Sequence, residues 1–389
     1  MTPGDRRSIR ILHVLYTMSV GGIQTWLMHI LRHIDRDRFR MDFLVHHINP
    51  CSYTDEIRAL GSQIIQCPHP RQHLLQPWVY DRRFKQILHK YGPYDIVHSH
   101  TADFNGYVLR LAQQASISVR IAHSHDDTSS CQAKARFYRR LYLILMKWWI
   151  AQHATIGLGV SRKAVAYLFG SSWKTDPRWQ ILPCGTDLAG FREPIDCAAV
   201  RAEFGIPADA FTIGHVGRLA EQKNPLFLLE IAAEVLKREP RMHLLLVGDG
   251  SLRSRLEAKV RQEGLSDRVI FAGVRSDVPR LMRGAMDVFL FPSLHEGLGL
   301  ALIEAQAAGL PCVLSDIVPE EADVVKPLVQ RISLSQSASA WAEAVVAARG
   351  KASAITPANA LAVVENSPFN IEMSVKKLVE VYEANFSIC

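Results

Sequence analysis

The run HEGLGLALIE, residues 295–304, contains two glutamates separated by seven residues. It follows the apolar run DVFLFPS, which is typical of a buried strand. If one helix held both glutamates, they would lie ~80° apart around its axis, since each residue turns the helix by about 100°. We therefore place Glu296 in a loop and Glu304 in the first turns of a helix. Carboxylates in such positions suit sugar hydroxyls, from which they accept charge-assisted hydrogen bonds.

Two glycines in the same run, Gly297 and Gly299, would let a ligand approach the backbone closely. A helix that begins here leaves its first N–H groups unpaired, and these groups attract a diphosphate. The amides that we expect to face the diphosphate belong to Leu298, Gly299, Leu300 and Ala301. The alternative is a capped amphipathic helix without a ligand, ended by Gly309 and Pro311.

A second candidate anion site lies in GRLAEQKN, residues 217–224, which follows another apolar run. Arg218 and Lys223 flank a loop that leads into a helix, with Gly217 at its start. Arginine binds phosphate as a planar fork and lysine as a point charge, so both suit an anion at that helix N-terminus. The alternative is a pair of solvated surface cations.

Gly21 and Gly22 follow the first apolar run and open a helical pattern, so they could also border a ligand. A simple tight turn is the alternative. The pair does not form G-x-G-x-x-G, and no acidic residue ends the next strand, MDFLVH. A dinucleotide site is therefore not expected here.

Four histidines form two HSH triplets, at residues 98–100 and 123–125, each at the end of a predicted strand. Period-two alternation puts both histidines of a triplet on one face, and neighbouring strand ends could bring the triplets together. At least one histidine could contact a substrate. The alternatives are histidines bonded to the backbone and a metal site, for which no nearby Cys or Glu completes a familiar ligand set.

Apolar runs alternate with helical patterns along the whole chain, which predicts doubly wound α/β sheets of parallel strands. The expected strands cover residues 10–16, 41–46, 95–100, 119–124, 154–160, 211–217, 242–248, 269–272, 287–292 and 311–316. The expected helices cover residues 22–34, 83–91, 132–152, 224–238, 252–263, 300–308 and 373–384. A segment rich in Pro and Gly, residues 182–194, separates two domains at 1–192 and 193–372.

Composition narrows the class of protein. A net charge of +7 suits anionic partners, but acidic residues are plentiful and no block of like charge occurs, so nucleic acid is not an expected partner. Seven scattered cysteines without C-x-x-C argue against disulfides and zinc, and favour a reducing cytoplasm. The N-terminus does not resemble a signal peptide, and the most apolar segment, residues 141–151, is too short to span a bilayer.

The segment KARFYRRLYLILMKWWI, residues 134–150, is basic and aromatic. Its apolar residues favour a helix packed on a sheet, and contact with an anionic membrane is the alternative. Ser161, ahead of RKAVAYL, is expected to cap a helix rather than to act as a nucleophile.

Several of these runs resemble a known family. GRLAEQKN, VGDGSLRSRLE, VIFAGV and HEGLGLALIEAQAAGLPCVLSD resemble the C-terminal domain of retaining glycosyltransferases of family four, whose signature is E-x7-E. ILHVLYTMSVGGIQTWL and HSHD resemble the N-terminal domain of its exopolysaccharide and capsule subgroup, and SPFNIEMSVKKLVEVY resembles that subgroup's C-terminal end. The resemblance implies the GT-B fold, with two Rossmann-like domains facing across a cleft and a final helix, residues 373–389, crossing back to the first.

The resemblance also implies roles for single residues. Gly22, next to Gly21, would approach the donor phosphate or the acceptor. His125 would lie beside the transferred sugar, and we prefer it to His123 because the family places this histidine just before a short polar loop.

In the second domain, the resemblance implies that Arg218 and Lys223 stabilise the diphosphate. Glu296 would hold sugar hydroxyls and Glu304 the nucleotide ribose. Such enzymes need no metal, since the cations take its place, and no cofactor besides the nucleotide diphosphate sugar.

The implied reaction transfers a sugar, preferably from a UDP-sugar, to a hydroxyl of a glycan or lipid-linked acceptor with retention of configuration. We expect it in the cytoplasm, with the inner face of the plasma membrane as an alternative location. Three other readings are open: a sugar-nucleotide epimerase on the same fold, a non-catalytic protein that binds sugar nucleotides, and a histidine-rich metal hydrolase.

Overall fold

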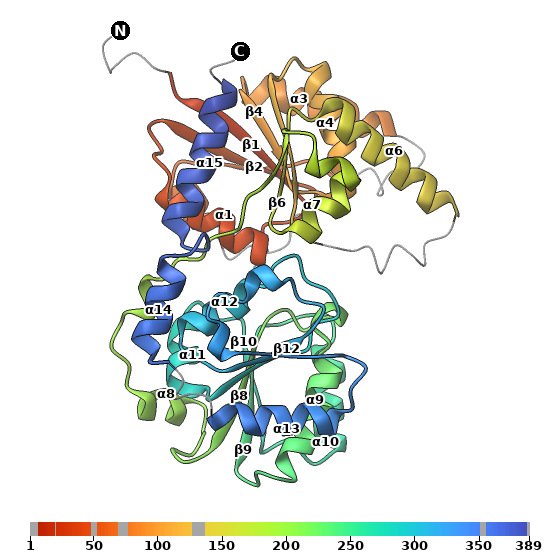
Figure 1. Cartoon of the computed structure of the whole chain (residues 1–389). Coiled ribbons are helices and arrows are strands. Elements are labelled where there is room, and N and C mark those ends of the chain that lie inside the picture. Colours follow the sequence, from red (N-terminus) through yellow and green to blue (C-terminus); the bar gives the residue numbers. More distant parts are fainter. Residues whose placement is uncertain are drawn as a thin grey trace. The chain divides into compact units, whose positions relative to one another are not determined.

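The computed structural model of the chain describes residues 7–19, 21–47, 53–68, 77–126, 137–350 and 355–386. The chain forms two compact units (Figure 1). Unit 1 contains residues 1–185 and 371–389, and unit 2 contains residues 186–370. The chain therefore passes from unit 1 to unit 2 after Gly185 and returns after Asn370.

Unit 1 contains a parallel sheet of seven strands in the order β3-β2-β1-β4-β5-β6-β7. The order reverses between β1 and β4, which is where open parallel sheets bind ligands. The strands are β1 (Ile9–Leu15), β2 (Phe39–Val45), β3 (Ile64–Gln66), β4 (Ile96–Ser99), β5 (Val119–Ser124), β6 (Ile156–Gly159) and β7 (Trp179–Ile181).

Helices cover both faces of this sheet (Figure 1). On one face, α1 and α15 contact each other through Trp26, whose Nε1 donates to Ser374 Oγ over 3.0 Å. The other face carries an apolar core, built with side chains of α3, α4, α6 and α7. The helices are α1 (Gly22–His33), α2 (Thr54–Ala59), α3 (Pro77–Tyr91), α4 (Asn105–Gln114), α6 (Phe137–His153), α7 (Arg162–Phe169) and α15 (Ile371–Phe386).

Unit 2 contains a parallel sheet of six strands in the order β10-β9-β8-β11-β12-β13, which reverses between β8 and β11. The strands are β8 (Phe211–Val216), β9 (Met242–Val247), β10 (Val269–Gly273), β11 (Val288–Phe291), β12 (Cys312–Ser315) and β13 (Val329–Ile332). The helices are α8 (Cys197–Glu203), α9 (Pro225–Leu236), α10 (Arg253–Gln262), α11 (Val278–Ala285), α12 (Leu300–Ala307), α13 (Ala338–Arg349) and α14 (Pro357–Glu365). The central strands are near-continuous apolar runs, because they are buried on both faces.

All ten expected strands are present, and three further strands, β3, β7 and β13, were missed. Each missed strand is three or four residues long and lies at an edge of its sheet, where few apolar residues are needed. The expected helix at 132–152 is described only from Phe137, since residues 132–136 lie outside the described ranges. Ser161 caps α7 as predicted, because its Oγ accepts a hydrogen bond from the Ala164 amide over 3.2 Å.

Candidate functional site

The predicted anion site of unit 2 lies at the point where its strand order reverses. Residues 217–224 follow β8, and residues 292–299 follow the adjacent strand β11. Two hydrogen bonds join these loops: the Leu294 amide donates to Gln222 O over 2.8 Å, and Gln222 Nε2 donates to His295 O over 3.1 Å. The two loops therefore form one connected rim at the carboxyl end of the sheet.

Lys223 and Glu296 form an ion pair within this rim. Lys223 Nζ lies 2.5 Å from Glu296 Oε1, and the exposed fractions of the side chains are 15% and 5%. The same ammonium lies 4.7 Å from the centre of the Phe291 ring, where it gains a cation–π contact. The low exposure strengthens the pairing and fixes both charges in place.

Arg218, in the same loop as Lys223, differs from it in exposure and in pairing. Its side chain is exposed, and within the described ranges its guanidinium makes no hydrogen bond or ion pair. A guanidinium at a strand end without a protein partner is available to an anionic ligand.

Close backbone packing supports the loop that carries Arg218. Gly248 has φ +131°, and a Cβ there would lie 2.1 Å from the carbonyl oxygen of Gly217. A Cβ at Gly250 would lie 2.4 Å from the carbonyl oxygen of Leu219. The GDG turn after β9 therefore has to be glycine at both ends for this approach. This positioning role was not predicted from the sequence.

The predicted loop and helix around E-x7-E are confirmed. Glu296 lies in the loop, and Glu304 is the fifth residue of α12. Gly299 begins the helix in the left-handed region, at φ +91° and ψ +63°, so a residue with a side chain would be strained there. Gly309, at φ +77°, follows the helix C-terminus as expected.

The amides at this helix N-terminus belong to the residues named from the sequence. Gly297, Leu298 and Gly299 are buried, whereas Leu300 and Ala301 are half-buried at the start of α12. The first N–H groups of a helix have no acceptor within the helix, so they can bind an anion.

Glu304 is half-buried, and its removal from water raises its pKa to about 7. Thr186 Oγ1 donates to Glu304 Oε1 over 2.8 Å, which opposes this rise only in part. Thr186 is itself held by its amide, which donates to Phe369 O over 2.8 Å. Thr186 lies more than a hundred residues from Glu304 in the sequence, and no local pattern identified it as a partner of Glu304.

The four histidines of the triplets converge in unit 1, and a fifth histidine, His13 of β1, joins them. His13 Nδ1 lies 2.9 Å from His100 Nε2, and His100 Nδ1 lies 2.7 Å from His125 Nε2. His125 Nδ1 then lies 3.7 Å from Cys184 Sγ. A row of imidazoles thus runs from the buried His13 to the half-buried His125.

The two remaining histidines form a second branch. His98 Nε2 lies 3.1 Å from His123 Nδ1, and His98 Nδ1 lies 2.9 Å from the hydroxyl of Tyr382 on α15. His123 is fully buried, its ring 5.3 Å from Trp26 of α1. The idea that these side chains bond to the backbone is therefore wrong, because they bond mainly to one another.

All five imidazoles are neutral near pH 7. Burial lowers the pKa of His13 and of His125 to about 3. Burial and the neighbouring imidazoles lower the pKa of the other three histidines well below the ordinary range, and these are His98, His100 and His123. Two groups of three histidines have ring nitrogens within 4.8 Å of one another, a spacing that a metal ion could exploit. Their mutual hydrogen bonds account for the arrangement without one.

Gly21 and Gly22 follow the carboxyl end of β1, and the histidines lie at the same end of the sheet, since β1, β4 and β5 are parallel. Gly21 is extended, with φ −179°, and accepts a hydrogen bond from the Thr25 amide over 2.8 Å. Gly22 is exposed at the start of α1. The structure thus gathers the predicted residues at the carboxyl ends of two sheets, one in each unit.

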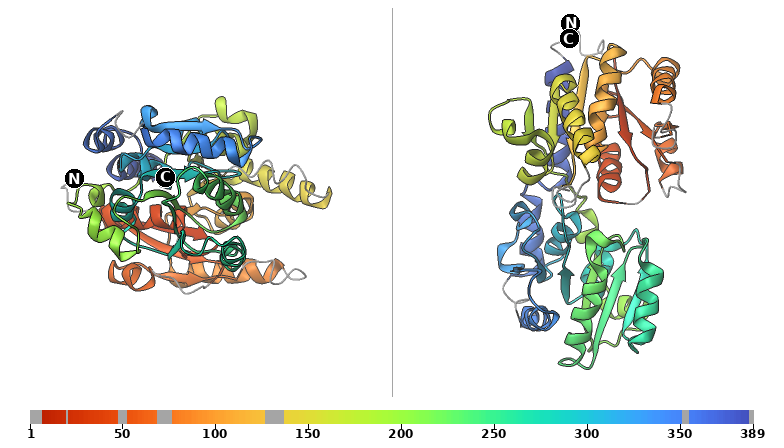
Figure 2. Two further views of the ribbon diagram at one scale, coloured as in Figure 1. Left: turned by 90° about the horizontal axis from the view of Figure 1, so that it is seen from below. Right: turned by 90° about the vertical axis from the view of Figure 1, so that its right-hand side faces the viewer.

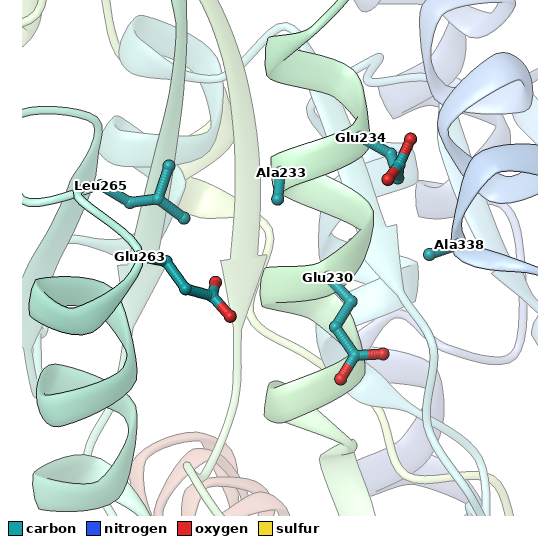
Figure 3. Close-up of a pocket in the computed structure, with 6 residues that line it drawn as sticks. All are labelled: Glu230, Ala233, Glu234, Glu263, Leu265 and Ala338. Atoms are coloured by element: carbon teal, nitrogen blue, oxygen red, sulfur yellow. The ribbon is translucent and has the colours of Figure 1, made fainter.

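Figure 3 shows a separate pocket of unit 2, lined by Glu230, Ala233, Glu234, Glu263, Leu265 and Ala338. Lys259 pairs with two of its glutamates, at 2.9 Å from Glu263 and 3.7 Å from Glu230. The third, Glu234, pairs with Lys237. Each of its acidic groups thus already has a cationic partner, and the pocket shares no residue with the rim after β8 and β11.

Comparison with known proteins gives consistent results for both units. Residues 198–348 match the family "Glycosyl transferases group 1", and residues 20–189 match "Glycosyltransferase Family 4". The chain is 38% identical over 340 residues to the "Putative glycosyltransferase EpsF" of Bacillus subtilis, which covers 87% of each chain. It is 31% identical over 237 residues to a UDP-Gal:α-D-GlcNAc-diphosphoundecaprenol α-1,3-galactosyltransferase of Escherichia coli, covering 59% of this chain and 60% of the relative.

Solved structures share the fold. HepE of Anabaena in complex with UDP-glucose superposes with a TM-score of 0.78 at 19% identity, over 97% of this chain and all of that one. WaaG, a glycosyltransferase involved in lipopolysaccharide biosynthesis, superposes with a TM-score of 0.74 at 20% identity, over 95% and 99% of the two chains. The expected GT-B class of fold is confirmed by these likenesses. Among the described residues, no helix combines the length and apolar character that crossing a membrane requires.

Proposed function

Since the chain belongs to family 4 of the glycosyltransferases, we propose that it transfers a sugar from a nucleotide diphosphate sugar to a hydroxyl with retention of configuration. The observation that carries this proposal is the shielded Lys223–Glu296 pair beside the exposed Arg218, at the N-terminus of α12. Such a site offers fixed positive charge for a diphosphate and a fixed carboxylate for sugar hydroxyls.

The cations would act on the leaving group. When the sugar C1–O bond breaks, negative charge grows on the diphosphate while the sugar becomes oxocarbenium-like. An ammonium has three N–H donors, so Lys223 can keep its bond to Glu296 and donate to a phosphate oxygen as well. Arg218 and the amides of α12 would complete the set of donors.

The two glutamates would bind the donor at separate points. Glu296, held by Lys223, would accept hydrogen bonds from sugar hydroxyls. Glu304 would accept them from the ribose, and a ribose hydroxyl favours the ionised form of a carboxyl group whose pKa is about 7.

His125 would contact the transferred sugar as a neutral hydrogen-bonding group, since burial lowers its pKa to about 3. We assign no enzyme carboxylate as a nucleophile. The acceptor hydroxyl would attack C1 from the face that the diphosphate leaves, and the leaving phosphate would accept its proton. We propose that no metal or further cofactor takes part, because the cations and amides supply the charge stabilisation.

The choice of substrates is supported by relatives. The name of the Escherichia coli relative specifies UDP-galactose and an acceptor on diphosphoundecaprenol. The HepE structures hold UDP, UDP with glucose, or UDP-glucose. We therefore propose a UDP-sugar donor and a glycan or lipid-linked acceptor, used in the synthesis of cell-surface polysaccharide at the cytoplasmic side of the membrane.

The test begins with a thermal-shift panel of UDP, GDP, ADP and their sugars, in which we expect UDP compounds to raise the melting temperature most. Transfer is then measured with the preferred donor and a lipid-linked acceptor, for the wild type and for Lys223→Ala and Arg218→Ala. Losing one preorganised donor should lower the rate by ~10²–10³. Arg261→Ala is the matched control, because Arg261 is exposed in the last turn of α10, at the end of that helix opposite to the one that contacts the rim.

Full activity in both folded site variants would show that the cations have another role. Conversion of the donor to an isomeric sugar nucleotide without any acceptor would instead identify an epimerase.

A further inference from the structure

Helix α6 of unit 1 carries a stripe of large apolar side chains that are exposed. Phe137, Tyr138, Leu141, Ile144, Leu145 and Trp148 are each 43–76% exposed. Their spacing of three, four and seven residues puts them on one side of the helix. In Figures 1 and 2 this yellow helix extends beyond the other elements of its own unit.

The opposite side of α6 is firmly packed, so the exposure does not come from an undocked helix. Leu143, Met146 and Ile150 are buried. A Cβ at Gly106 of α4 would lie 2.3 Å from the Met146 carbonyl oxygen, so α4 and α6 approach closely. The packed side of α6 therefore lies mainly on helix α4 rather than directly on the sheet as expected, and the other side is exposed.

The stripe is unusual for this molecule. Thirteen large hydrophobic residues are exposed among those that the structure describes, and six of them lie on this one helix. Scattered exposed apolar residues need no explanation, whereas a contiguous patch marks a surface that another apolar body covers.

The charge around the stripe selects the kind of partner. Between Asp127 and Asp176 the sequence contains eight lysines and arginines and no acidic residue. Within α6 these are Arg139, Arg140 and Lys147. A second copy of this helix would bring like charges together, but an anionic lipid surface would attract them. The aromatic side chains Tyr138 and Trp148 also suit the boundary between water and lipid.

We propose that α6 docks unit 1 on an anionic phospholipid bilayer. The helix lies in the plane of the headgroups, its apolar stripe enters the boundary with the acyl chains, and the excess of positive charge around the stripe attracts the lipid phosphates. This surface belongs to unit 1 alone, and its existence does not depend on the proposed reaction. It also explains how an acceptor on a lipid carrier would be reached.

The experiment compares sedimentation of the protein with two kinds of vesicle. One kind contains phosphatidylcholine alone, and in the other about one quarter of the lipid is phosphatidylglycerol. We expect the full chain to bind the anionic vesicles, and binding to weaken as salt is raised. Trp148→Asn should reduce the bound fraction at least several-fold, and Ile144→Asn should act in the same direction. Trp78→Asn is the matched control, because Trp78 is 63% exposed on α3 of the same unit. Thermal melting checks that each variant is folded.

Several outcomes would overturn the proposal. These are equal binding to both kinds of vesicle, no binding at all, or an equal loss in the Trp78→Asn control. A dimer in light scattering that Trp148→Asn dissociates would show that a second copy covers the stripe. Transfer to a water-soluble acceptor should be unchanged in Trp148→Asn, so failure of docking and failure of the proposed reaction give different results.

Discussion

Mild acid should destabilise unit 1 far more than unit 2. An unfolded histidine binds a proton near its ordinary pKa of 6.5, whereas burial lowers the pKa of the folded His13 and His125 to about 3. Between these values the unfolded state binds more protons than the folded state, so the free energy of unfolding falls as the pH falls.

The magnitude follows from these pKa values. Lowering the pH from 7.5 to 5.5 costs somewhat over ~1 kcal/mol for each such histidine, and therefore ~3 kcal/mol for His13 and His125 together. Three more histidines of the cluster change stability in the same direction, because their pKa values are also lowered: His98, His100 and His123.

Unit 2 provides an internal control, because two of its groups oppose each other. Burial lowers the pKa of His215 to about 4, which costs somewhat over ~1 kcal/mol over the same pH interval. Burial raises the pKa of Glu304 to about 7, so the folded state binds more protons than the unfolded state, and ~2 kcal/mol is gained. The two contributions nearly cancel.

The assay is urea unfolding at pH 7.5 and pH 5.5, followed by a pulse of hydrogen exchange at one common pH and mass spectrometry of peptides. With a urea m-value of ~2–3 kcal/mol/M, the midpoint for peptides of β1, β4 and β5 should fall by about 1 M or more. The midpoint for peptides of β8, β9 and β11 should move much less. Equal shifts in the two units would refute the reasoning.

Three further predictions concern unit 2. Affinity for UDP-glucose should fall up to about tenfold per pH unit below pH 7 as Glu304 is protonated, and titration calorimetry should find this dependence lost in Glu304→Gln. Glu296→Gln should lower kcat, and adding Lys223→Met should lower kcat much less in this variant than in the wild type, because the pair acts as a unit in a double-mutant cycle. Gly248→Ala would meet a backbone oxygen at 2.1 Å and should cost more than ~3 kcal/mol in urea unfolding, whereas Gly205→Ala, in open space at φ +66°, should cost ~1 kcal/mol.

Local patterns were sufficient for part of the site. The positions of Glu296 and Glu304 follow from two glycines and the start of an apolar helical period, all within ten residues. The triplets could be placed because alternation along a strand fixes which side chains share a face.

Other features depend on contacts between distant segments and left no local signal. His13 is an unremarkable residue in its own strand, and it joins the cluster only because β1 lies beside β4. Tyr382 reaches His98 from the last helix, and Thr186 reaches Glu304 across more than a hundred residues. The edge strands were missed because pairing along a single side requires little apolar character.

The row of imidazoles from His13 to His125 has a preferred polarity. A neutral imidazole has one donor and one acceptor nitrogen, so the tautomers of His13, His100 and His125 must all change together. If Nδ1 of each carries the hydrogen, the buried His13 Nε2 is left as a lone pair; the reverse order would leave an N–H there without an acceptor among the described residues, which is costlier. His125 thus directs an N–H at Cys184 Sγ, a weak acceptor that a ligand oxygen can replace. The buried His13 therefore determines that His125, at the half-buried end of the row, donates a hydrogen bond from Nδ1 rather than accepting one.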